Sequence, residues 1–570
     1  MSKWILPDVP DLSGLIKQTG LSHFMTRLLY LRGRKTPREM EDFLHPLAAK
    51  RPDPFLLQDM DKAVTRIHEA IEGSETIRII GDYDQDGIAA TAILMIALQR
   101  LGASVDFRIP DRVQDGYGIA PKHVQEAKND GIGLLLTCDN GVAAFEAAEA
   151  AYDQGIDLIV TDHHQLQETL PTTYALINPH RKEDKYPFKP LAGAGVALKL
   201  CEALWEKRKT ADFPSILYGY AAMGTVCDVM DLVGENRMLV VKGLQVLNTR
   251  PSPGIRALQE EAKISGALDV YTLGFVIGPT INAAGRLGNA EDGVSLLLAS
   301  DAIRAKQLAQ QLRRLNVQRQ ELTETALEHV REQIPDPLPD ILVLKTDCHE
   351  SLLGIVAGKL RDAYYRPAIV LAASSEEEML KGSGRSISSY NMIAHLQEVD
   401  DVLQQYGGHA MAAGLRLHTD DLERFRAKLS ENWKPEENDL ERNLRIDFPI
   451  DLRYVDPALA REIERLEPYG KGNPKPVFAS NQVELAGVKV IGKNRNTLRF
   501  RFRRGSREYT GIQFRGAEET LKKMYTKFGR RFESAFQEQG EGLMVSIAYT
   551  PQMNEYAGAR FLQLVIEDIR

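Results

Sequence analysis

The 570-residue sequence predicts an α/β protein with a parallel-sheet domain, a second α/β domain joined to it by a long helix, and a small C-terminal β domain. Three observations predict this class. Apolar strand-like runs alternate with helix-like segments from about residue 61, segment 301–334 contains no Gly or Pro, and short strands dominate from about residue 444. Strand–helix alternation is typical of parallel sheets. A prior of about 150 residues per domain gives three or four domains.

Short apolar runs predict the strands of the first domain, which we assign to residues 61–300. Residues 1–60, which precede it, are expected to form an N-terminal helical cap. The expected strands are Ile77–Ile80, Leu134–Thr137 and Leu158–Thr161, and the expected helices are 88–101, 121–130 and 142–153. Ligands of parallel sheets bind beyond the carboxyl ends of the strands. Functional residues are therefore expected directly after these strands.

A connecting helix and two further domains complete the predicted architecture. Segment 301–334 would form a helix of about 50 Å at ~1.5 Å per residue, and the three prolines between 335 and 339 end it. Residues 335–440 form the second α/β domain and residues 441–570 the β domain. Their expected elements are strands at 341–344 and Ala368–Ala372, a helix near 352–364, and strands at Val488–Ile491, Leu498–Phe502 and Met544–Ala548.

Composition excludes several protein classes. No apolar run reaches the ~18 residues of a membrane span, and the N-terminus lacks the apolar core of a signal peptide. The four cysteines form no Cys-x-x-Cys pair, which argues against structural zinc and a disulfide framework and predicts the reducing cytoplasm. The net charge of -8 weakens an argument for nucleic-acid binding from bulk charge. It leaves room for a local basic groove.

Three carboxylates alternate in Asp82-Tyr83-Asp84-Gln85-Asp86-Gly87, where an apolar strand gives way to a helix. Crowded carboxylates raise one another's pKa unless a cation lies between them, so the cluster indicates a hard divalent metal. An EF-hand loop begins similarly but needs a Glu six residues after the Gly, where this chain has Ile93. The remaining alternative is a polar turn whose carboxylates cap the helix N-terminus.

Potential metal ligands also follow the next two predicted strands. Asp139 follows the second strand, and Asp162-His163-His164 follows the third. A neighbouring carboxylate orients a His ring and raises its basicity as a ligand. Mixed carboxylate and imidazole ligands suit Mn²⁺, with Mg²⁺ and Co²⁺ as alternatives. The number of ligands exceeds what one ion needs and predicts two divalent ions, an arrangement that serves phosphoryl displacement.

Four motifs carry a resemblance to a known superfamily. Segments Gly81–Gly87, Cys138–Gly141, Asp162–His164 and Gly224–Asp228 resemble, in order and spacing, the successive motifs of the DHH phosphoesterases. Within that superfamily the chain resembles the RecJ family of single-strand-specific 5′→3′ exonucleases over essentially its whole length. The resemblance implies that the metal ligands are Asp82, Asp84, Asp86, Asp139, His163 and Asp228.

The resemblance also implies roles within this site. Asp139 would bridge the two ions, and His164 would act beside the scissile phosphate. Asp162 would lie in the next layer of residues, outside the metal ligands. Many DHH relatives carry a His at the position of Ile80. Which of the three alternating Asp residues ligate directly therefore stays open.

Three further motifs resemble the substrate-binding segments of the same family, including its accessory DHHA1 domain. They are Ile281–Gly288, Lys381–Ser386 and Tyr406–Ala410. Guanidinium groups, hydroxyls and exposed backbone N–H groups are suited to binding phosphate. The implied substrate-binding residues are Asn282, Arg286, Ser383, Arg385, Ser386, Gly407, Gly408 and His409. The sequence Gly193-Ala-Gly195, by contrast, is interpreted as packing at the start of a helix.

The C-terminal β domain contains a basic stretch. Residues 489–507 carry eight Lys or Arg and no acid, and the resemblance places an OB-fold here. In Arg499-Phe-Arg-Phe-Arg503, alternation puts Arg and Phe on opposite faces of a strand. The basic face is either solvated or follows a phosphate backbone, and base stacking would require aromatic residues on that face. The candidate nucleic-acid-binding residues are Lys493, Arg495, Arg499, Arg501 and Arg503.

The expected function is removal of 5′-mononucleotides from single-stranded DNA by two-metal hydrolysis, in DNA recombination and repair. One alternative is a DHH phosphodiesterase acting on nanoRNA or cyclic dinucleotides, but such enzymes are usually shorter and lack the basic β domain. Another is a non-catalytic single-strand-binding scaffold, which the intact set of candidate ligands disfavours. The expected partners are single-stranded DNA, a RecQ-type helicase and a single-strand-binding protein, with no membrane and a monomeric chain.

Overall fold

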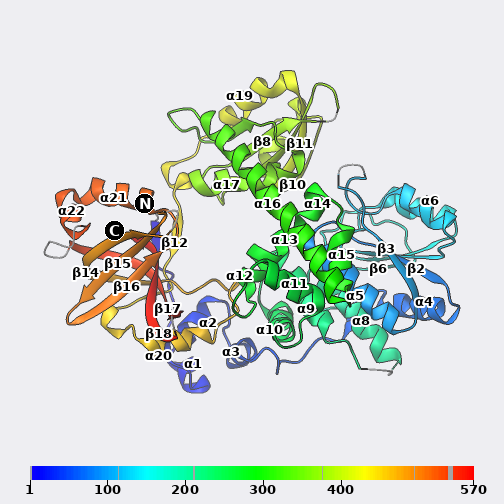
Figure 1. Cartoon of the computed structure of the whole chain (residues 1–570), viewed down its shortest axis with the longest axis horizontal. Helices are drawn as coiled ribbons and strands as arrows, with labels where there is room; N and C mark the ends of the chain where they lie inside the picture. The colour runs from blue at the N-terminus through cyan, green and yellow to red at the C-terminus, as the bar shows by residue number, and fades with distance from the viewer. Residues whose placement is uncertain are drawn as a thin grey trace. The chain divides into compact units, whose positions relative to one another are not determined.

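The structure is a computed structural model that describes residues 3–112, 115–208, 212–374, 376–492, 495–536, 543–556 and 558–570 (Figure 1). Its contacts group the chain into two compact units. One unit contains Arg51–Met230 and Leu239–Arg442, and the other contains Met1–Lys50, Asp231–Met238 and Asn443–Arg570. None of the helices in the described ranges is both long and apolar enough to cross a membrane.

The first sheet of the larger unit is entirely parallel, with strand order β3-β2-β4-β5-β6. Its strands are β2 (Thr76–Ile80), β3 (Ser104–Arg108), β4 (Leu134–Cys138), β5 (Asp157–Thr161) and β6 (Ala175–Ile177). The chain leaves β2 to form β3 on one side and then returns to place β4 on the other side. The reversal creates a crevice at the carboxyl ends of β2 and β4, where ligands of open α/β sheets bind.

The sheet contains two strands that apolar runs alone did not predict. β3 is an edge strand with half-exposed residues, and β6 is only three residues long. Neither forms the continuous apolar run that marks a strand buried on both faces. The three predicted strands are the central ones, and they are almost completely buried.

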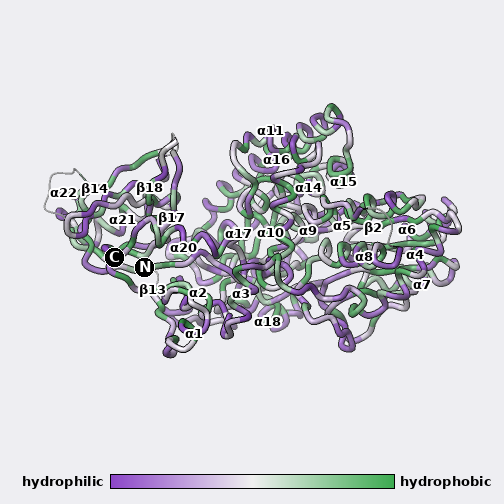
Figure 2. The backbone as a smooth tube through the Cα atoms, turned by 90° about the horizontal axis from the view of Figure 1, so that it is seen from below, coloured by the Kyte–Doolittle hydropathy of each residue, from purple (hydrophilic) through white to green (hydrophobic). Residues whose placement is uncertain are grey.

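Helices pack around this sheet, and three of them form a layer that contacts the carboxylate motifs. In Figure 1, α5, α8 and α9 lie side by side, and each pair of them is in contact. Figure 2 shows hydrophobic stretches in this region, in agreement with the almost complete burial of α9. The helices around the sheet are α4 (Met60–Glu72), α5 (Gln85–Arg100), α6 (Pro121–Asn129), α7 (Phe145–Asp153), α8 (Gly193–Arg208) and α9 (Ile216–Cys227).

The predicted connecting helix is α16, which spans Ala302–Glu332. The helix packs against helices that precede it in the sequence, and Gln310 and Gln311 in its first half donate hydrogen bonds to Glu261 (3.0 Å) and Asp292 (2.7 Å). Its second half contributes Ala326, Leu327 and Val330 to a hydrophobic core with the next domain. The preceding elements are α10 (Gly234–Thr249), α11 (Pro253–Glu261), α12 (Val270–Thr272), the π-helical turn η2 (Leu273–Ile277), α13 (Gly278–Asn282), α14 (Ala284–Leu287) and α15 (Glu291–Leu298).

The second α/β domain has a mixed sheet with strand order β10-β11-β9-β8-β7, in which only the β7–β8 pair is parallel. The glycine-containing segments predicted to bind substrate lie in strands β9 and β10. The elements are β7 (Leu342–Lys345), α17 (Leu353–Tyr364), β8 (Ala368–Ala373), β9 (Met379–Arg385), α18 (Met392–Gln397), β10 (Gln405–His409), β11 (Ala412–His418) and α19 (Leu422–Asn432).

The smaller unit contains a five-stranded barrel formed by β14, β15, β16, β18 and β17, and pairing of β14 with β17 closes it. Closure leaves few open strand edges. Figure 1 shows α21 and α22 beside the barrel strands. The elements are β12 (Asn443–Arg445), β13 (Phe448–Pro449), α20 (Pro457–Glu464), β14 (Phe478–Ile491), β15 (Thr497–Arg504), β16 (Arg507–Gln513), α21 (Ala517–Phe528), α22 (Arg530–Phe536), β17 (Leu543–Tyr556) and β18 (Ala559–Ile569).

The N-terminal helices share the hydrophobic core of the barrel. Met25 and Phe43 belong to the same buried cluster as Phe500 and Phe502. The almost fully buried guanidinium of Arg237 donates hydrogen bonds to the carbonyls of Phe43 and Glu467, at 2.8 and 2.6 Å. The N-terminal elements are β1 (Lys3–Ile5), α1 (Ser13–Thr19), α2 (His23–Leu31) and α3 (Pro37–Leu44), and β1 pairs with β12.

Candidate metal centre and nucleic-acid interface

The alternating carboxylates occupy the junction between β2 and α5. Asp84 is the N-cap of α5, and its Oδ1 accepts hydrogen bonds from the backbone N–H groups of Asp86 (2.8 Å) and Gly87 (3.2 Å). Asp82 and Asp86 are almost fully buried. Helix capping thus explains the position of Asp84, but it does not explain why Asp82 and Asp86 are buried.

Asp86 is held by the start of another helix. Its two carboxylate oxygens accept hydrogen bonds from the backbone N–H groups of Gly193 (2.7 Å) and Ala194 (3.0 Å). These groups belong to the first turn of α8, whose unpaired N–H groups and dipole favour an anion. The helix start predicted at Gly193-Ala-Gly195 is therefore present, and it fixes the Asp86 carboxylate.

Asp139 follows β4 in a left-handed backbone conformation, with φ of 63°. Its neighbour Asn140 is fully buried and donates hydrogen bonds to the carbonyls of Ile80 (3.1 Å) and Cys138 (2.9 Å). Left-handed backbone conformations of residues other than glycine persist only where the surrounding structure holds them in place. The Asn140 amide therefore ties the ends of β2 and β4 together and sets the direction of Asp139.

His163 joins the carboxylates from three motifs. Its Nε2 atom lies 3.0 Å from Asp139 Oδ1, 3.8 Å from Asp86 Oδ2 and 3.7 Å from Asp228 Oδ2. Burial and the charge of the adjacent His164 lower the pKa of His163 to about 4. The imidazole is therefore neutral near pH 7, which is the protonation state that ligates a metal.

Three overlapping groups of side chains could each hold an ion. Within each group, ligand atoms from the three members lie within 4.8 Å of one another. Asp139 belongs to two groups and so does His163, so the groups form one continuous centre. The groups are Asp82–Asp84–Asp139, Asp86–His163–Asp228 and Asp139–His163–His164.

The electrostatics of these carboxylates fit divalent cations. Burial, followed by the charges of neighbouring Asp residues, raises the pKa of Asp82, Asp86 and Asp139 well above the ordinary value. Oδ1 of Asp82 and Oδ1 of Asp139 are buried and accept no hydrogen bond from any described residue. Buried carboxylate oxygens without donors are costly unless a cation compensates them, so the residues fit the predicted metals.

The side chain of His164 is oriented by Asp162. His164 Nδ1 lies 2.7 Å from Oδ1 of the fully buried Asp162, which also accepts a hydrogen bond from the backbone N–H of His163 at 2.7 Å. Burial alone would lower the pKa of His164, but the hydrogen bond with Asp162 and the charges of nearby carboxylates raise it to about 9. His164 therefore places a cationic donor, 44% exposed, beside the metal groups.

Two aromatic residues at the site were missed by the sequence analysis. The hydroxyl of Tyr117 donates a hydrogen bond to the backbone carbonyl of Asp139 (2.9 Å) and lies 3.3 Å from the ring nitrogens of His164. Tyr83 packs edge-on to Tyr117, and the guanidinium of Arg112 lies 4.7 Å from the centroid of the Tyr83 ring. Tyr117 and Arg112 lie in an irregular segment after β3 that carries no motif, so only the folded chain reveals them.

Arg286 connects the first domain to the second. Its Nη1 donates a hydrogen bond to the Ser351 carbonyl (2.5 Å), and the Ser351 hydroxyl donates one to the Arg286 carbonyl (3.1 Å). Burial and the nearby cations Arg112 and Arg319 lower the pKa of Arg286 to about 10. Clustered, desolvated cations repel one another, and an anion between them would relieve that repulsion.

The predicted substrate-binding residues of the second domain mostly share one region of its sheet. Ser383 and Arg385 alternate on β9, and the guanidinium donates a hydrogen bond to the Ser383 hydroxyl at 3.0 Å. A Cβ atom built on Gly354, in the first turn of α17, would lie 2.5 Å from Arg385 Nη2. His409 pairs with Ala412, which also pairs with Arg385. Arg385 and His409 thus stand in one row across the sheet.

The other predicted substrate-binding residues lie in three different environments. Gly407 and Gly408 lie on the exposed edge strand β10, with φ of 144° at Gly408. Ser386 is fully buried, and its hydroxyl donates a hydrogen bond to the Tyr390 carbonyl at 2.5 Å, so it does not join Ser383 and Arg385. Asn282 ends α13 with a buried Oδ1 that accepts no hydrogen bond from the described residues.

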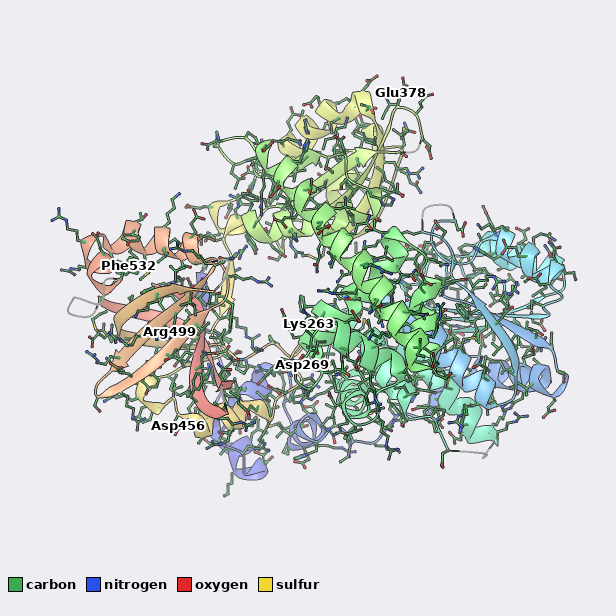
Figure 3. All side chains as sticks on the ribbon, in the orientation of Figure 1. Lys263, Asp269, Glu378, Asp456, Arg499 and Phe532 are labelled. Carbon is green, nitrogen blue, oxygen red and sulfur yellow. The ribbon has the colours of Figure 1, made fainter. Side chains whose placement is uncertain are left out.

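The barrel strand β15 has the predicted alternation. Phe500 and Phe502 are buried in the barrel, whereas Arg499 and Arg501 are exposed; Figure 3 labels Arg499 on the barrel. Arg503 differs because it forms ion pairs with Glu484 (3.2 Å) and Glu508 (3.0 Å).

An aromatic residue also lies near this basic face. Phe514 is 57% exposed, and its carbonyl accepts a hydrogen bond from the Thr497 hydroxyl at 3.3 Å. It directly follows β16, in which Ile512 pairs with Arg499. Arg495 is exposed in the turn that precedes β15. Lys493 lies outside the described residues.

Known protein families match three parts of the chain. Residues 76–225 match the DHH family N-terminal domain, residues 339–434 match the DHHA1 domain, and residues 446–568 match the RecJ OB domain. These matches agree with the predicted fold class of a parallel-sheet domain, a second α/β domain and an OB-like barrel.

Relatives and solved structures match far more than single domains. The chain is 36% identical over 523 residues to the single-stranded-DNA-specific exonuclease RecJ of Bacillus subtilis, a match that covers 90% of this chain and 65% of that protein's length. It is 31% identical to the RecJ of Escherichia coli, over 96% of both chains. The crystal structure of RecJ in complex with Mn²⁺ from Thermus thermophilus matches with a TM-score of 0.82 at 29% identity, covering 100% of this chain and 79% of the other. The chain therefore belongs to the RecJ family of single-stranded-DNA-specific exonucleases.

Proposed function

We propose that this chain is a metal-dependent exonuclease that removes 5′-mononucleotides from single-stranded DNA by phosphodiester hydrolysis, in DNA recombination and repair. The observation that carries the proposal is the continuous centre in which Asp139 and His163 each belong to two groups of potential ligands. Family membership supports the choice of single-stranded DNA as substrate. A RecQ-type helicase and a single-strand-binding protein as partners, and a monomeric chain, remain parts of the proposal.

The two divalent ions would be divided among the motifs. Asp82, Asp84 and Asp139 would hold one ion, and Asp86, His163 and Asp228 the other, because each trio brings its ligand atoms within 4.8 Å of one another. Asp139 would bridge them, because its Oδ1 lies 3.0 Å from Nε2 of His163 in the second trio. Mn²⁺ is the expected metal, and Mg²⁺ and Co²⁺ are alternatives that suit the same ligands.

The residues around the ions would bind and orient the reacting phosphate. Divalent ions bound here would activate water and neutralise charge on the phosphate oxygens. His164, whose pKa is raised by its hydrogen bond with Asp162, would present an N–H donor to a phosphate oxygen whose negative charge grows during the reaction. Asp162 would keep that ring in place, and Tyr117 would hold the Asp139 backbone through its hydroxyl.

The arginines between the first and second domains would bind the phosphate at the end of the strand. Arg286 and Arg385 both have a pKa lowered first by burial and then by other arginines, with Arg112 among the causes for each. Guanidinium groups bind phosphate through two parallel hydrogen bonds. Together with Ser383 and His409, these arginines would bind the terminal phosphate. Cleavage would then be restricted to the end of the strand, as in an exonuclease.

The decisive experiment is digestion of one strand carrying a different label at each end, with Mn²⁺ and with EDTA. We expect Mn²⁺-dependent release of the 5′ label as a mononucleotide, while the 3′ label stays in long products. Asp139→Ala should lower the rate by more than the ~10–100-fold that is typical for residues that merely support a metal ligand, since one side chain serves both ions. Prior release of the 3′ label would contradict the polarity, and an active Asp139→Ala variant would contradict the site.

The fold of the Asp139→Ala protein must be verified independently. Near-native circular dichroism and a cooperative thermal transition would show that the loss of activity arises at the site. A control variant, Asp153→Ala, changes an exposed carboxylate at the end of α7 and should digest the strand at the wild-type rate.

A further inference from the structure

An exposed aromatic pair lies on the segment between two motifs of the active site. The rings of Tyr271 and Phe275 are stacked, with centroids 5.1 Å apart and an interplanar angle of 23°. The side chains are 57% and 70% exposed. Within the described part of the chain, this is the one stacked aromatic pair in which both rings are exposed. Neither residue belongs to a motif used above.

The pair lies on a segment that is capped at its start and partly buried. Asp269 caps α12, because its Oδ1 accepts a hydrogen bond from the Thr272 backbone N–H at 2.8 Å. Residues Leu273–Ile277 then form a π-helical turn, a feature found frequently at functional sites. Leu273 and Ile277 are buried beneath the turn, whereas Tyr271 and Phe275 face solvent. The exposed rings therefore project from a fixed base.

This base is also fixed relative to the metal motifs. The Cys227 thiol contacts the Leu273 carbonyl at 3.5 Å, and a Cβ atom built on Gly278 would lie 2.4 Å from that sulfur. Cys227 directly precedes the candidate ligand Asp228. Beyond the turn, α13 and α14 carry Asn282 and Arg286. The aromatic pair thus belongs to the continuous segment that runs from one candidate ligand to the candidate phosphate-binding arginine.

We propose that Tyr271 and Phe275 form a stacking platform for the bases of the single strand, an inference that rests on the proposed function. Every base has a flat face, so aromatic rings bind single strands without regard to sequence. The surroundings favour bases over a protein partner. The segment leading to the pair, 263–270, has exposed small and charged residues, and Figure 3 labels its two charged members, Lys263 and Asp269. A protein-binding patch would be broader and more apolar at its centre.

The test measures binding of a 3′-labelled, 5′-phosphorylated oligothymidylate of 20 nucleotides in EDTA, which prevents cleavage. The double variant Tyr271→Ser/Phe275→Ser should bind about tenfold more weakly than the wild type, as expected for the loss of stacking on one base. The variant Tyr271→Phe/Phe275→Tyr keeps both rings and should bind like the wild type. Tyr152→Ser removes a 77% exposed aromatic ring from α7 and serves as the matched control, with unchanged binding.

A series of strands with one abasic site at successive positions identifies the contact. An abasic site at the position that meets the platform should weaken binding to the wild type but not to the Ser double variant, because the two changes remove the same interaction. Wild-type affinity in the double variant, or abasic effects that persist in it at every position, would overturn the platform and leave the rings to a protein partner. Failure of the proposed function would show separately, as an intact strand with the wild type and Mn²⁺.

Discussion

Individual carboxylates in this protein combine local and long-range roles. Asp84 caps a helix and Asp86 is bound by the start of another helix, while both also lie in candidate ligand groups. The polar-turn explanation and the metal-site explanation of the cluster are thus compatible. Asp82 is the residue that requires the metal-site explanation. It is buried, its pKa is raised, and its Oδ1 atom has no hydrogen-bond donor among the described residues.

Asp82→Asn should stabilise the metal-free protein and weaken metal binding. Burial and the charge of Asp84 raise the pKa of Asp82 in the folded chain, so the wild type loses stability relative to Asn as pH rises above the ordinary value of 3.8. Each unit of that pKa shift corresponds to about 1.4 kcal/mol. In EDTA, we expect the variant to unfold at a higher urea concentration than the wild type, with a difference that widens from acid to neutral pH.

Metal titration provides the second half of this prediction. Mn²⁺ at 100 times its dissociation constant should stabilise the wild type by about 2.7 kcal/mol, and the variant by clearly less. The exposed Asp153→Asn should change stability in EDTA by no more than about 0.5 kcal/mol. An Asp82→Asn protein that is less stable than the wild type in EDTA would contradict the account of the cluster.

At the scale of elements, the start of α8 forms one wall of the metal centre. Gly193 gives its N–H to Asp86, and a Cβ atom at this position would lie 2.5 Å from Asp139 Oδ1. The sequence predicted a helix start here, but periodicity does not show which side chains approach it. The same holds for the long helix α16. Its existence was predictable from a segment without Gly or Pro, whereas its packing against elements that precede and follow it depends on residues far away in the sequence.

Gly193→Ala should therefore weaken the metal centre without unfolding α8. The new methyl group would displace the Asp139 carboxylate, so we expect Mn²⁺ affinity to fall by at least about tenfold, with a stability cost of about 1–3 kcal/mol. Gly195→Ala is the matched control on the same helix, because the three atoms nearest to its Cβ atom would all belong to Leu191, at ordinary contact distances of 3.4–3.9 Å. Isothermal titration with Mn²⁺ distinguishes the two, and equal affinities would refute the role of Gly193.

Across the whole molecule, charge is distributed unevenly. The chain carries a net charge of -8, yet residues 489–507 carry eight basic residues and no acid. The barrel turns this local excess into a face on which Arg499 and Arg501 are exposed, while Arg503 is paired with two Glu side chains. Because a local patch determines the field that a strand meets, the acidic total does not oppose DNA binding.

Arg499→Ala/Arg501→Ala should weaken single-strand binding most strongly at low salt. Each lost phosphate contact reduces the slope of log affinity against log salt concentration by about 0.7 for single strands. Fluorescence anisotropy with a labelled oligothymidylate at several salt concentrations should therefore show a slope smaller by about 1.4 than that of the wild type. Arg503→Ala, whose charge is already paired, should change the slope much less, and an equal change would contradict this reading of the barrel face.

By itself, the sequence determined the central strands, the connecting helix and the metal-binding residue types, because these depend on local apolar runs and closely spaced polar side chains. The tertiary structure decided the edge strands β3 and β6 and the merging of the N-terminal helices with the barrel core. It also decided the approach of Tyr117 to Asp139 and the burial of Ser386. These features depend on contacts between residues far apart in the chain, where neither periodicity nor spacing carries information. The metal centre itself needed both, since motifs supplied the ligands and the reversal of strand order brought them together.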